Sequence, residues 1–248
     1  MGFLNKLFGK TAQDAPEHSN TPVADLLTAY AGMALDKQSC LMDVLDAGGS
    51  WNVDLNMGEL YFDGETGIAI QAIGSFSYES ESWLWAWANE ASALPEKVLG
   101  DAQRLREYGE QHGIAWLLEA SFAATTQQLH EIAAAAVGIC AADAYYLGDY
   151  GQGILLMTLR DLRLHHAHTS SPHSRTLTII PQMVSLFTLP NHLAAVTHYL
   201  SAKGYRINTQ GNTLTAERTD GCLNAYFDEQ SRLSNVKSTL QPQNSNAS

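Results

Sequence analysis

The chain has 248 residues, and its 45% hydrophobic and 9% aromatic content is typical of a folded globular protein. Its 26 aspartates and glutamates outnumber its 14 lysines and arginines, which gives a formal net charge of −12. This surplus repels phosphate groups, so we expect no nucleic-acid partner, and any protein partner is expected to be basic.

The three cysteines, Cys40, Cys140 and Cys222, are too far apart in the sequence to form a metal or redox motif. Scattered cysteines of this kind are typical of a reducing compartment. No apolar run reaches the roughly 18 residues that a membrane-spanning helix needs, and charged residues interrupt the N-terminal apolar segment, which lacks the pattern of a signal peptide. We therefore expect a cytoplasmic protein without an integral membrane segment.

The first part of the chain combines one helix with a series of strands. Residues 1–22 are predicted to form a tail and linker. Apolar residues spaced three and four apart then predict a helix from about 23 to 44, ended by Gly48 and Gly49. From Trp51 onward the pattern alternates with a period of two, and three turns divide it into four strands.

The pairing of these strands follows from the centres of their turns. The turn centres place Phe76 opposite Trp85 and Gly74 opposite Trp87, and all the apolar residues of the four strands then fall on one face. We therefore predict a four-stranded antiparallel meander with one buried face.

Trp83, Trp85 and Trp87 stand at every second position of the fourth predicted strand and so share a face. Three aligned indoles could form a platform for sugars or bases. Because the other apolar strand residues lie on the same face, and amphipathic helices flank the meander, we interpret the three indoles as core.

The predicted main domain continues to residue 164. A helix is expected from Pro95 to about His112, and Thr125 or Thr126 begins an alanine-rich helix that runs to about Ala142. A β-hairpin follows, with strands at 145–147 and 154–159.

A smaller α+β domain is predicted after this hairpin. Residues 165–174, rich in histidine and serine, are predicted to form a linker, and 175–240 the domain. Within it we expect an extended segment at 177–187 that Pro181 interrupts, a helix at 190–203 and a meander of four strands. The turns of this meander place Leu214 opposite Ile207 and opposite Phe227. Residues 241–248 are predicted to be a disordered tail. The overall prediction is an α+β fold in which a meander packed on helices precedes a smaller helix-plus-meander unit.

Four histidines are the candidates for a metal site. His165, His166, His168 and His173 are close in sequence, and imidazoles at near spacing can share a transition-metal ion. The alternative is an exposed linker whose histidines titrate near pH 6.5. Because no cysteine or placed carboxylate other than Asp161 completes a site, we expect no metal, and no cofactor motif occurs either.

The polar face of the first meander is the candidate ligand site. Asp54, Tyr61, Gln71 and Ser75 would lie on it and could line a cleft if another element covered that face. The alternative is that these residues form the solvated side of a sheet, which is the common arrangement in antiparallel sheets. No catalytic residues are identified.

Three sequence segments carry a resemblance to a known family. The segments Gln71–Ser77, Trp83–Asn89 and Leu94–Pro95 resemble an uncharacterised family of bacterial proteins, a domain of unknown function. The likeness covers roughly residues 23–161 and implies no activity.

The C-terminal part resembles the helix-plus-meander unit of secretion-chaperone-like proteins, which hold partner proteins. Those relatives usually end in a further helix, whereas we expect none in residues 241–248. The residues that carry it are Val196, Tyr199, Leu200, Gly204, Tyr205, Leu214 and Ala225–Phe227.

Two functions follow from these observations. The first is a non-enzymatic, cytoplasmic protein-binding module of the chaperone, immunity or regulatory type, which the acidic balance and the lack of catalytic motifs favour. The second is an enzyme or small-ligand binder that uses the polar face around Asp54, Tyr61 and Gln71. A pocket with a convergent carboxylate and tyrosine would favour the second.

Overall fold

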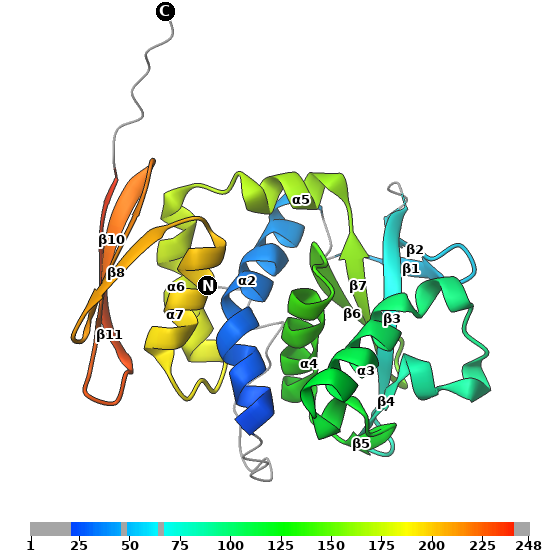
Figure 1. The fold of residues 1–248 in the computed structure, drawn as a ribbon. Coiled ribbons are helices and arrows are strands. Elements are labelled where there is room, and N and C mark those ends of the chain that lie inside the picture. The colour runs from blue at the N-terminus through cyan, green and yellow to red at the C-terminus, as the bar shows by residue number, and fades with distance from the viewer. Residues whose placement is uncertain (1–20, 46–48, 64–66, 241–248) are drawn as a thin grey trace, which may run out of the picture.

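The computed structural model describes residues 21–45, 49–63 and 67–240. It confirms the predicted α+β class with an antiparallel meander, and Figure 1 shows a group of helices standing between two antiparallel sheets. The predicted tails at 1–22 and 241–248 lie outside the described residues, except that the first helix already begins at Thr21.

The first sheet is organised around its longest strand, β3. β7 pairs with β3 along residues 69–77 on one edge. Because a strand has only two edges, β2 and β4 share the other one, β2 at residues 68–69 and β4 at 74–77. The strands are β1 (Trp51–Asp54), β2 (Glu59–Phe62), β3 (Ile68–Ser77), β4 (Ser82–Trp85), β5 (Ser121–Ala123), β6 (Ala144–Asp149) and β7 (Gly153–Arg160).

The strand register differs from the prediction by two residues. Phe76 pairs with Trp83 and Gly74 pairs with Trp85, instead of with Trp85 and Trp87 respectively. A shift of two still places the apolar residues of one strand opposite apolar residues of the next, so the hydrophobic pattern alone does not detect it.

A β-bulge overturns the prediction that all apolar residues of the meander share one face. Ala72 pairs with Met157 and Gly74 pairs with Leu156, so Ile73 is an extra residue in β3. Since successive residues of β7 point to opposite faces, everything in β3 after the bulge changes face. The first sheet consequently buries apolar side chains on both of its faces.

The interpretation of the indoles as core is confirmed for Trp83 and Trp85, which are both 0% exposed and pack edge to face with ring centroids 5.4 Å apart. The predicted strand ends at Trp85, and Trp87 lies half-buried in the short 3-10 helix η1 (Ala86–Ala88). Gly74 is required beside the indoles, because a Cβ atom there would lie 2.3 Å from Cζ2 of Trp83.

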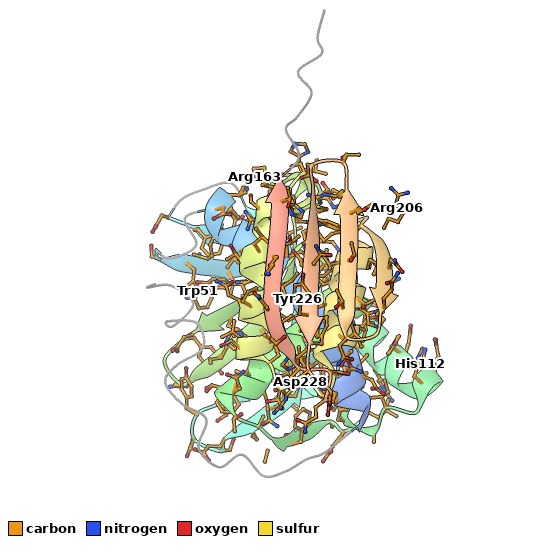
Figure 2. All side chains as sticks on the ribbon, turned by 90° about the vertical axis from the view of Figure 1, so that its left-hand side faces the viewer. Trp51, His112, Arg163, Arg206, Tyr226 and Asp228 are labelled. Carbon is orange, nitrogen blue, oxygen red and sulfur yellow. The ribbon has the colours of Figure 1, made fainter. Side chains whose placement is uncertain are left out.

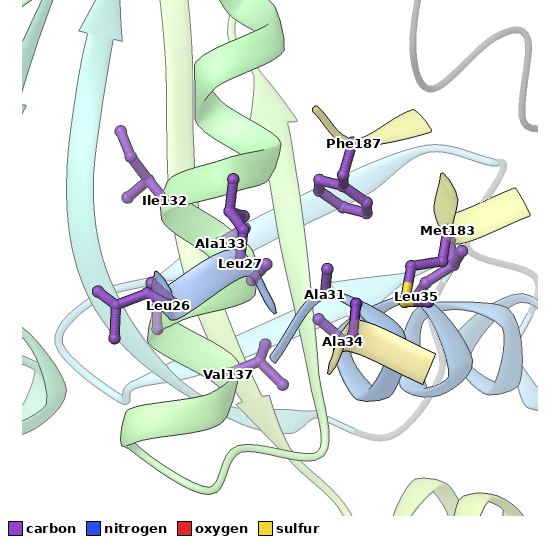
Figure 3. Close-up of a cluster of buried hydrophobic side chains, with 14 of the residues drawn as sticks. Leu26, Leu27, Ala31, Ala34, Leu35, Ile132, Ala133, Val137, Met183 and Phe187 are labelled. Carbon is purple, nitrogen blue, oxygen red and sulfur yellow. The ribbon is translucent and has the colours of Figure 1, made fainter. Parts of the chain in front are cut away.

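Six helices complete the described chain. Figure 3 shows apolar side chains of α2 and α4 meeting Met183 and Phe187 in one cluster. α4 begins with a capping box in which the Thr125 and Gln128 side chains bond each other's backbone N–H groups. The helices are α2 (Thr21–Val44), α3 (Gly100–His112), α4 (Thr126–Ile139), α5 (Leu162–Thr169), α6 (His173–Leu186) and α7 (His192–Ala202), with 3-10 turns η2 (Glu90–Ser92), η3 (Glu96–Val98) and η4 (Ala115–Leu117).

The structure of residues 165–187 differs from the expected pattern. The segment 165–174, predicted as a linker between two domains, contains most of α5 and the start of α6. The segment 177–187, predicted as extended, is helical as far as Leu186, with Pro181 inside the helix and exposed. The helix persists because its buried residues recur with helical spacing and pack into the core: Thr176, Ile179, Ile180 and Met183.

The second sheet has one buried and one outer face. Residues 223, 225 and 227 of β10 are buried and alternate with half-buried residues 222, 224 and 226. Figure 2 looks onto this sheet, with the helices behind it. Its strands, in the spatial order β11-β10-β9-β8, are β8 (Arg206–Gln210), β9 (Thr213–Arg218), β10 (Gly221–Phe227) and β11 (Leu233–Leu240).

The register of the second sheet also differs from the prediction by two residues. Leu214 pairs with Thr209 and Ala225, where the turn positions predicted Ile207 and Phe227. One cluster of buried residues extends from α2 and α4 through α6 and α7 to β9 and β10. The division into domains 23–164 and 175–240 stays a prediction.

Candidate functional site

The structure brings together only some of the residues predicted on the polar face of the first sheet. Asp54 lies opposite Glu59 and Tyr61 lies opposite Asn52, so these side chains share one face of the β1–β2 hairpin. Ser75 does not share a face of the sheet with Gln71, because the bulge at residue 73 puts the two side chains on opposite faces.

Gln71 and Asp54 both have partners within the fold. The Gln71 side-chain amide donates to the backbone oxygen of Lys97 at 2.8 Å and to that of Ile70 at 3.1 Å. Asp54 Oδ1 accepts the backbone N–H of Met57 at 2.9 Å, which shapes the turn between β1 and β2. These contacts give Gln71 and Asp54 local structural roles.

The acidic hairpin, which we define as residues 51–63, carries three carboxylates, those of Asp54, Glu59 and Asp63. Asp54 and Glu59 face each other directly across the strand pair, an arrangement of like charges that destabilises a sheet. The Tyr61 hydroxyl donates to Glu59, and this hydrogen bond raises the pKa of Tyr61. Met57, in the turn between the two acids, is 60% exposed.

The hairpin lies within a long segment of the chain whose charged residues are all acidic. Residues 38–96 contain ten aspartates and glutamates and no lysine, arginine or histidine, a formal charge of −10 out of −12 for the whole chain. The segment includes β1, β2, β3 and β4, and five of its acids lie on these strands or their turns: Asp54, Glu59, Asp63, Glu79 and Glu81.

Two of the four candidate metal ligands come together, and a carboxylate joins them. His165 Nδ1 lies 3.0 Å from Asp143 Oδ1, and His168 Nε2 lies 3.9 Å from the same oxygen. His166 is exposed and outside this group. His173 lies elsewhere in the fold. Asp143, which completes the cluster, precedes β6 and was not among the residues picked out from the sequence.

The environment of this cluster contains two lysines. Burial, reinforced by the positive charges of Lys37 and Lys203, lowers the pKa of His168 to about 4, while the negative charge of Asp143 acts in the opposite direction. Lys37 donates to the backbone oxygen of Ala142, and burial lowers its pKa as well. His168 is therefore an uncharged imidazole at neutral pH.

His173 is a buried structural residue at the start of α6. Only 1% of it is exposed, and its two ring nitrogens lie 2.7 Å from the Tyr205 hydroxyl and 2.7 Å from Ser238 Oγ. Its backbone N–H donates to Asp220 at 2.7 Å. Burial lowers the pKa of His173. These contacts attach α6 to the second sheet.

A buried charge cluster joins the two parts of the chain and was not predicted. Asp36 of α2 is fully buried, and its Oδ2 lies 2.8 Å from the ammonium of Lys203, which ends α7. Tyr199, 163 residues further along the chain, donates to the same oxygen at 3.3 Å. Arg175 of α6 lies 3.7 Å from the other carboxylate oxygen and also pairs with Asp43. No local sequence pattern reveals partners so far apart.

A partly buried ion pair holds α3 against the first sheet, with the Asp101 side chain 8% and the Arg160 side chain 39% exposed. Asp101 accepts two hydrogen bonds of 2.9 Å from Arg160 and one of 2.6 Å from Thr158. A bidentate pair of this kind fixes the start of α3 on β7. Because the Asp101 carboxylate is hydrogen-bonded by Arg160 and Thr158, we interpret this pair as structural.

Comparison with known proteins identifies the family. The model of a family of unknown function (DUF6882) matches residues 24–162, more than half of the chain, and the protein belongs to that family. No curated protein and no solved structure matches the chain. The likeness of the C-terminal part to secretion chaperones stays a prediction. Within the part of the chain that the structure describes, every helix is too short or too polar to cross a bilayer.

Proposed function

We propose that the chain is a non-enzymatic, cytoplasmic protein-binding module of the chaperone, immunity or regulatory type, and that its acidic hairpin binds a basic segment of a partner protein. The observation that carries this proposal is the opposition of Asp54 and Glu59 within a 38–96 segment that has no basic residue.

The energetics of the hairpin support a binding role. Like charges directly opposite each other destabilise a strand pair by up to about 1 kcal/mol. Surface residues that reduce stability are candidates for function, and the hydrogen bonds from Met57 to Asp54 and from Tyr61 to Glu59 hold the two carboxylates on the same face. A lysine or arginine from a partner would lie between the two carboxylates and remove their repulsion, so the unfavourable pair becomes favourable in the complex.

Met57 adds an apolar contact to this charged surface. Its side chain is 60% exposed at the turn between the two acids. Methionine is flexible and polarisable, and it is common at surfaces that adapt to a partner. The hairpin thus combines electrostatic attraction with an apolar anchor. Figure 1 shows it on the side of the molecule away from the second sheet.

The test compares two variants that carry the same change in net charge. In the first, Asp54→Asn, Glu59→Gln and Asp63→Asn remove the charges of the hairpin but keep its hydrogen-bond acceptors. In the control, Glu107→Gln, Glu119→Gln and Glu229→Gln neutralise exposed acids elsewhere. Each protein is immobilised and used to capture partners from a lysate of the cells that produce it.

We expect wild-type protein and the control to capture the same basic protein, and the hairpin variant to lose it. The captured protein should be released as salt is raised from about 0.1 to 1 M, because surface charges are then screened within about 3 Å. Equal capture by all three proteins, or no enrichment on wild type, would rule out the hairpin as the binding surface.

A further inference from the structure

A second site, independent of the acidic hairpin, lies where α5 meets the loop before β6. α5 begins at Leu162 behind the N-cap residue Asp161. Residues three apart on a helix are neighbours on its surface, so His165 and His168 lie side by side. Asp143 immediately precedes β6, and the N–H of Asp161 donates to its Oδ2 at 3.1 Å.

The three side chains converge on a small volume. One ligand atom from each of Asp143, His165 and His168 can be chosen so that all three lie within 4.8 Å of one another. Asp143 Oδ1 lies 3.0 Å from His165 Nδ1 and 3.9 Å from His168 Nε2. Ligand atoms bound about 2.0–2.2 Å from one zinc ion lie roughly 3–4 Å apart, so the preformed spacing needs little adjustment.

The carboxylate is already oriented for this role. Its Oδ2 is held by the N–H of Asp161, which leaves Oδ1 facing the two imidazoles. Metal-binding groups are commonly fixed by a second hydrogen bond of this kind. Asp143 and His168 are mostly buried, with side chains 12% and 10% exposed, whereas His165 is 60% exposed. The site is therefore anchored in the fold and open to solvent on one side.

The ligand set selects the class of ion. Calcium and magnesium take oxygen ligands, while two imidazoles with one carboxylate suit zinc and its neighbours in the first transition series. Lys37 and Lys203 act electrostatically on His168. Because two positive charges oppose any bound cation, we expect only an ion that binds imidazole strongly to occupy the site.

We propose that Asp143, His165 and His168 form a binding site for a divalent transition-metal ion of the zinc type, with at least one coordination position open to solvent. Three protein ligands and an open position are the arrangement of zinc sites that bind a further water or substrate molecule. His166 and His173 take no part in the site.

Zinc itself is the probe for this site. The full chain is freed of metal with a chelator and titrated with zinc chloride by calorimetry, together with Asp143→Asn, His165→Ala and the matched control His166→Ala. His166 is an exposed neighbour on the same helix, so the control removes one imidazole without touching the site. Asp143→Asn keeps an oxygen that can accept the N–H of Asp161. A loss of zinc binding in this variant would therefore reflect the missing carboxylate ligand and not a change in the fold.

We expect one zinc ion per chain for wild type and His166→Ala, and at least about tenfold weaker binding for Asp143→Asn and His165→Ala. Zinc should also raise the melting temperature of wild type and His166→Ala more than that of Asp143→Asn, because an ion that binds only the folded state stabilises it in proportion to its affinity. If Asp143→Asn bound zinc as tightly as wild type, other histidines among the nine would hold the ion and the proposal would be wrong. Absence of saturable binding in wild type would also overturn it.

Discussion

The two sheets of this protein use their faces differently. In the first sheet, β7 buries Leu156 toward one hydrophobic cluster and Met157 toward the other. In the second sheet, β10 buries every second residue and leaves Asn224 and Tyr226 on its outer side. When a sheet has one buried face, apolar and polar residues alternate along its strands, so the sequence indicates which side chains point inward. When both faces are buried, the strands are apolar throughout and the sequence does not indicate this.

The two parts of the chain also differ in how their charged residues are paired. Around the second sheet, basic and acidic residues are matched, as in the pairs of Arg218 with Asp220 and Arg232 with Asp228, both at 2.7 Å. In the acidic hairpin, Asp54 instead faces another acid, Glu59. These acids of the second part are paired with arginines, whereas Asp54 and Glu59 accept hydrogen bonds from uncharged groups of Met57 and Tyr61 and, in the proposed complex, contact a basic partner.

The largest expected effect concerns the doubly buried sheet. Trp85→Ala should reduce the free energy of unfolding by about 3–5 kcal/mol, because it removes a fully buried indole. Tyr226→Ala, on the outer face of the second sheet, should reduce it by about 1 kcal/mol or less. Urea denaturation of both variants measures the difference. Equal losses would mean that the two sheets are buried to a similar extent.

The buried charge cluster tests how the two parts are joined. Asp36→Ala should reduce the free energy of unfolding by about 3–5 kcal/mol, because it leaves the Lys203 ammonium buried without its carboxylate. The double variant Asp36→Leu with Lys203→Met should lose much less, since it removes both charges.

The same denaturation experiments also test the predicted domain division. All five tryptophans lie between residues 51 and 116, so their fluorescence reports on the first part alone. Because one cluster of buried residues spans both parts, we expect the fluorescence and circular dichroism transitions to coincide. Separate transitions would instead indicate that 23–164 and 175–240 unfold as independent domains.

The attachment of α6 to the second sheet should weaken in mild acid. Burial lowers the pKa of His173 in the folded protein below its unfolded value of about 6.5. Below that pH the unfolded state binds more protons, so the free energy of unfolding falls as the pH decreases toward the folded-state pKa. His173→Gln should reduce this slope between about pH 7 and 5, while His168 and His192 keep part of it. An unchanged slope would show that His173 does not contribute.

The smallest expected effect is a gain of stability. Glu59→Gln removes the repulsion with Asp54 and should raise the free energy of unfolding by about 0.2–1 kcal/mol. Glu107→Gln, on an exposed helical position, serves as the control for a general change of charge. A loss of stability in Glu59→Gln would show that the opposed carboxylates are not in conflict.

Much of the fold was predictable because local signals agree with it. The helix spacing from Leu26 to Leu41, the Thr125 cap and the alternation in β9 and β10 each indicate the element that forms. The bulge at Ile73 was not predictable, since an extra residue inside an apolar strand changes neither composition nor hydrophobicity. Pro181 was misleading because the tertiary contacts of Ile179 and Ile180 outweigh its effect on the helix.

The candidate sites were less predictable than the fold. His165 and His168 were picked out by their spacing, but Asp143 reaches them only through folding. The same holds for Asp36 and its partners on α6 and α7. Contacts between residues far apart in sequence leave no periodic or compositional signal, so they are visible only in the structure.

The most direct test of the proposed function is photo-crosslinking from the acidic hairpin. A photoreactive amino acid replaces Met57 in the full chain, and in a separate protein it replaces Leu118, an exposed apolar residue 37% accessible to solvent. Both proteins are irradiated in the cells that produce them. We predict a discrete adduct with a basic protein from position 57 that is absent from position 118 and lost when Asp54 and Glu59 are neutralised. No adduct from position 57, or the same adducts from both positions, would contradict the proposal.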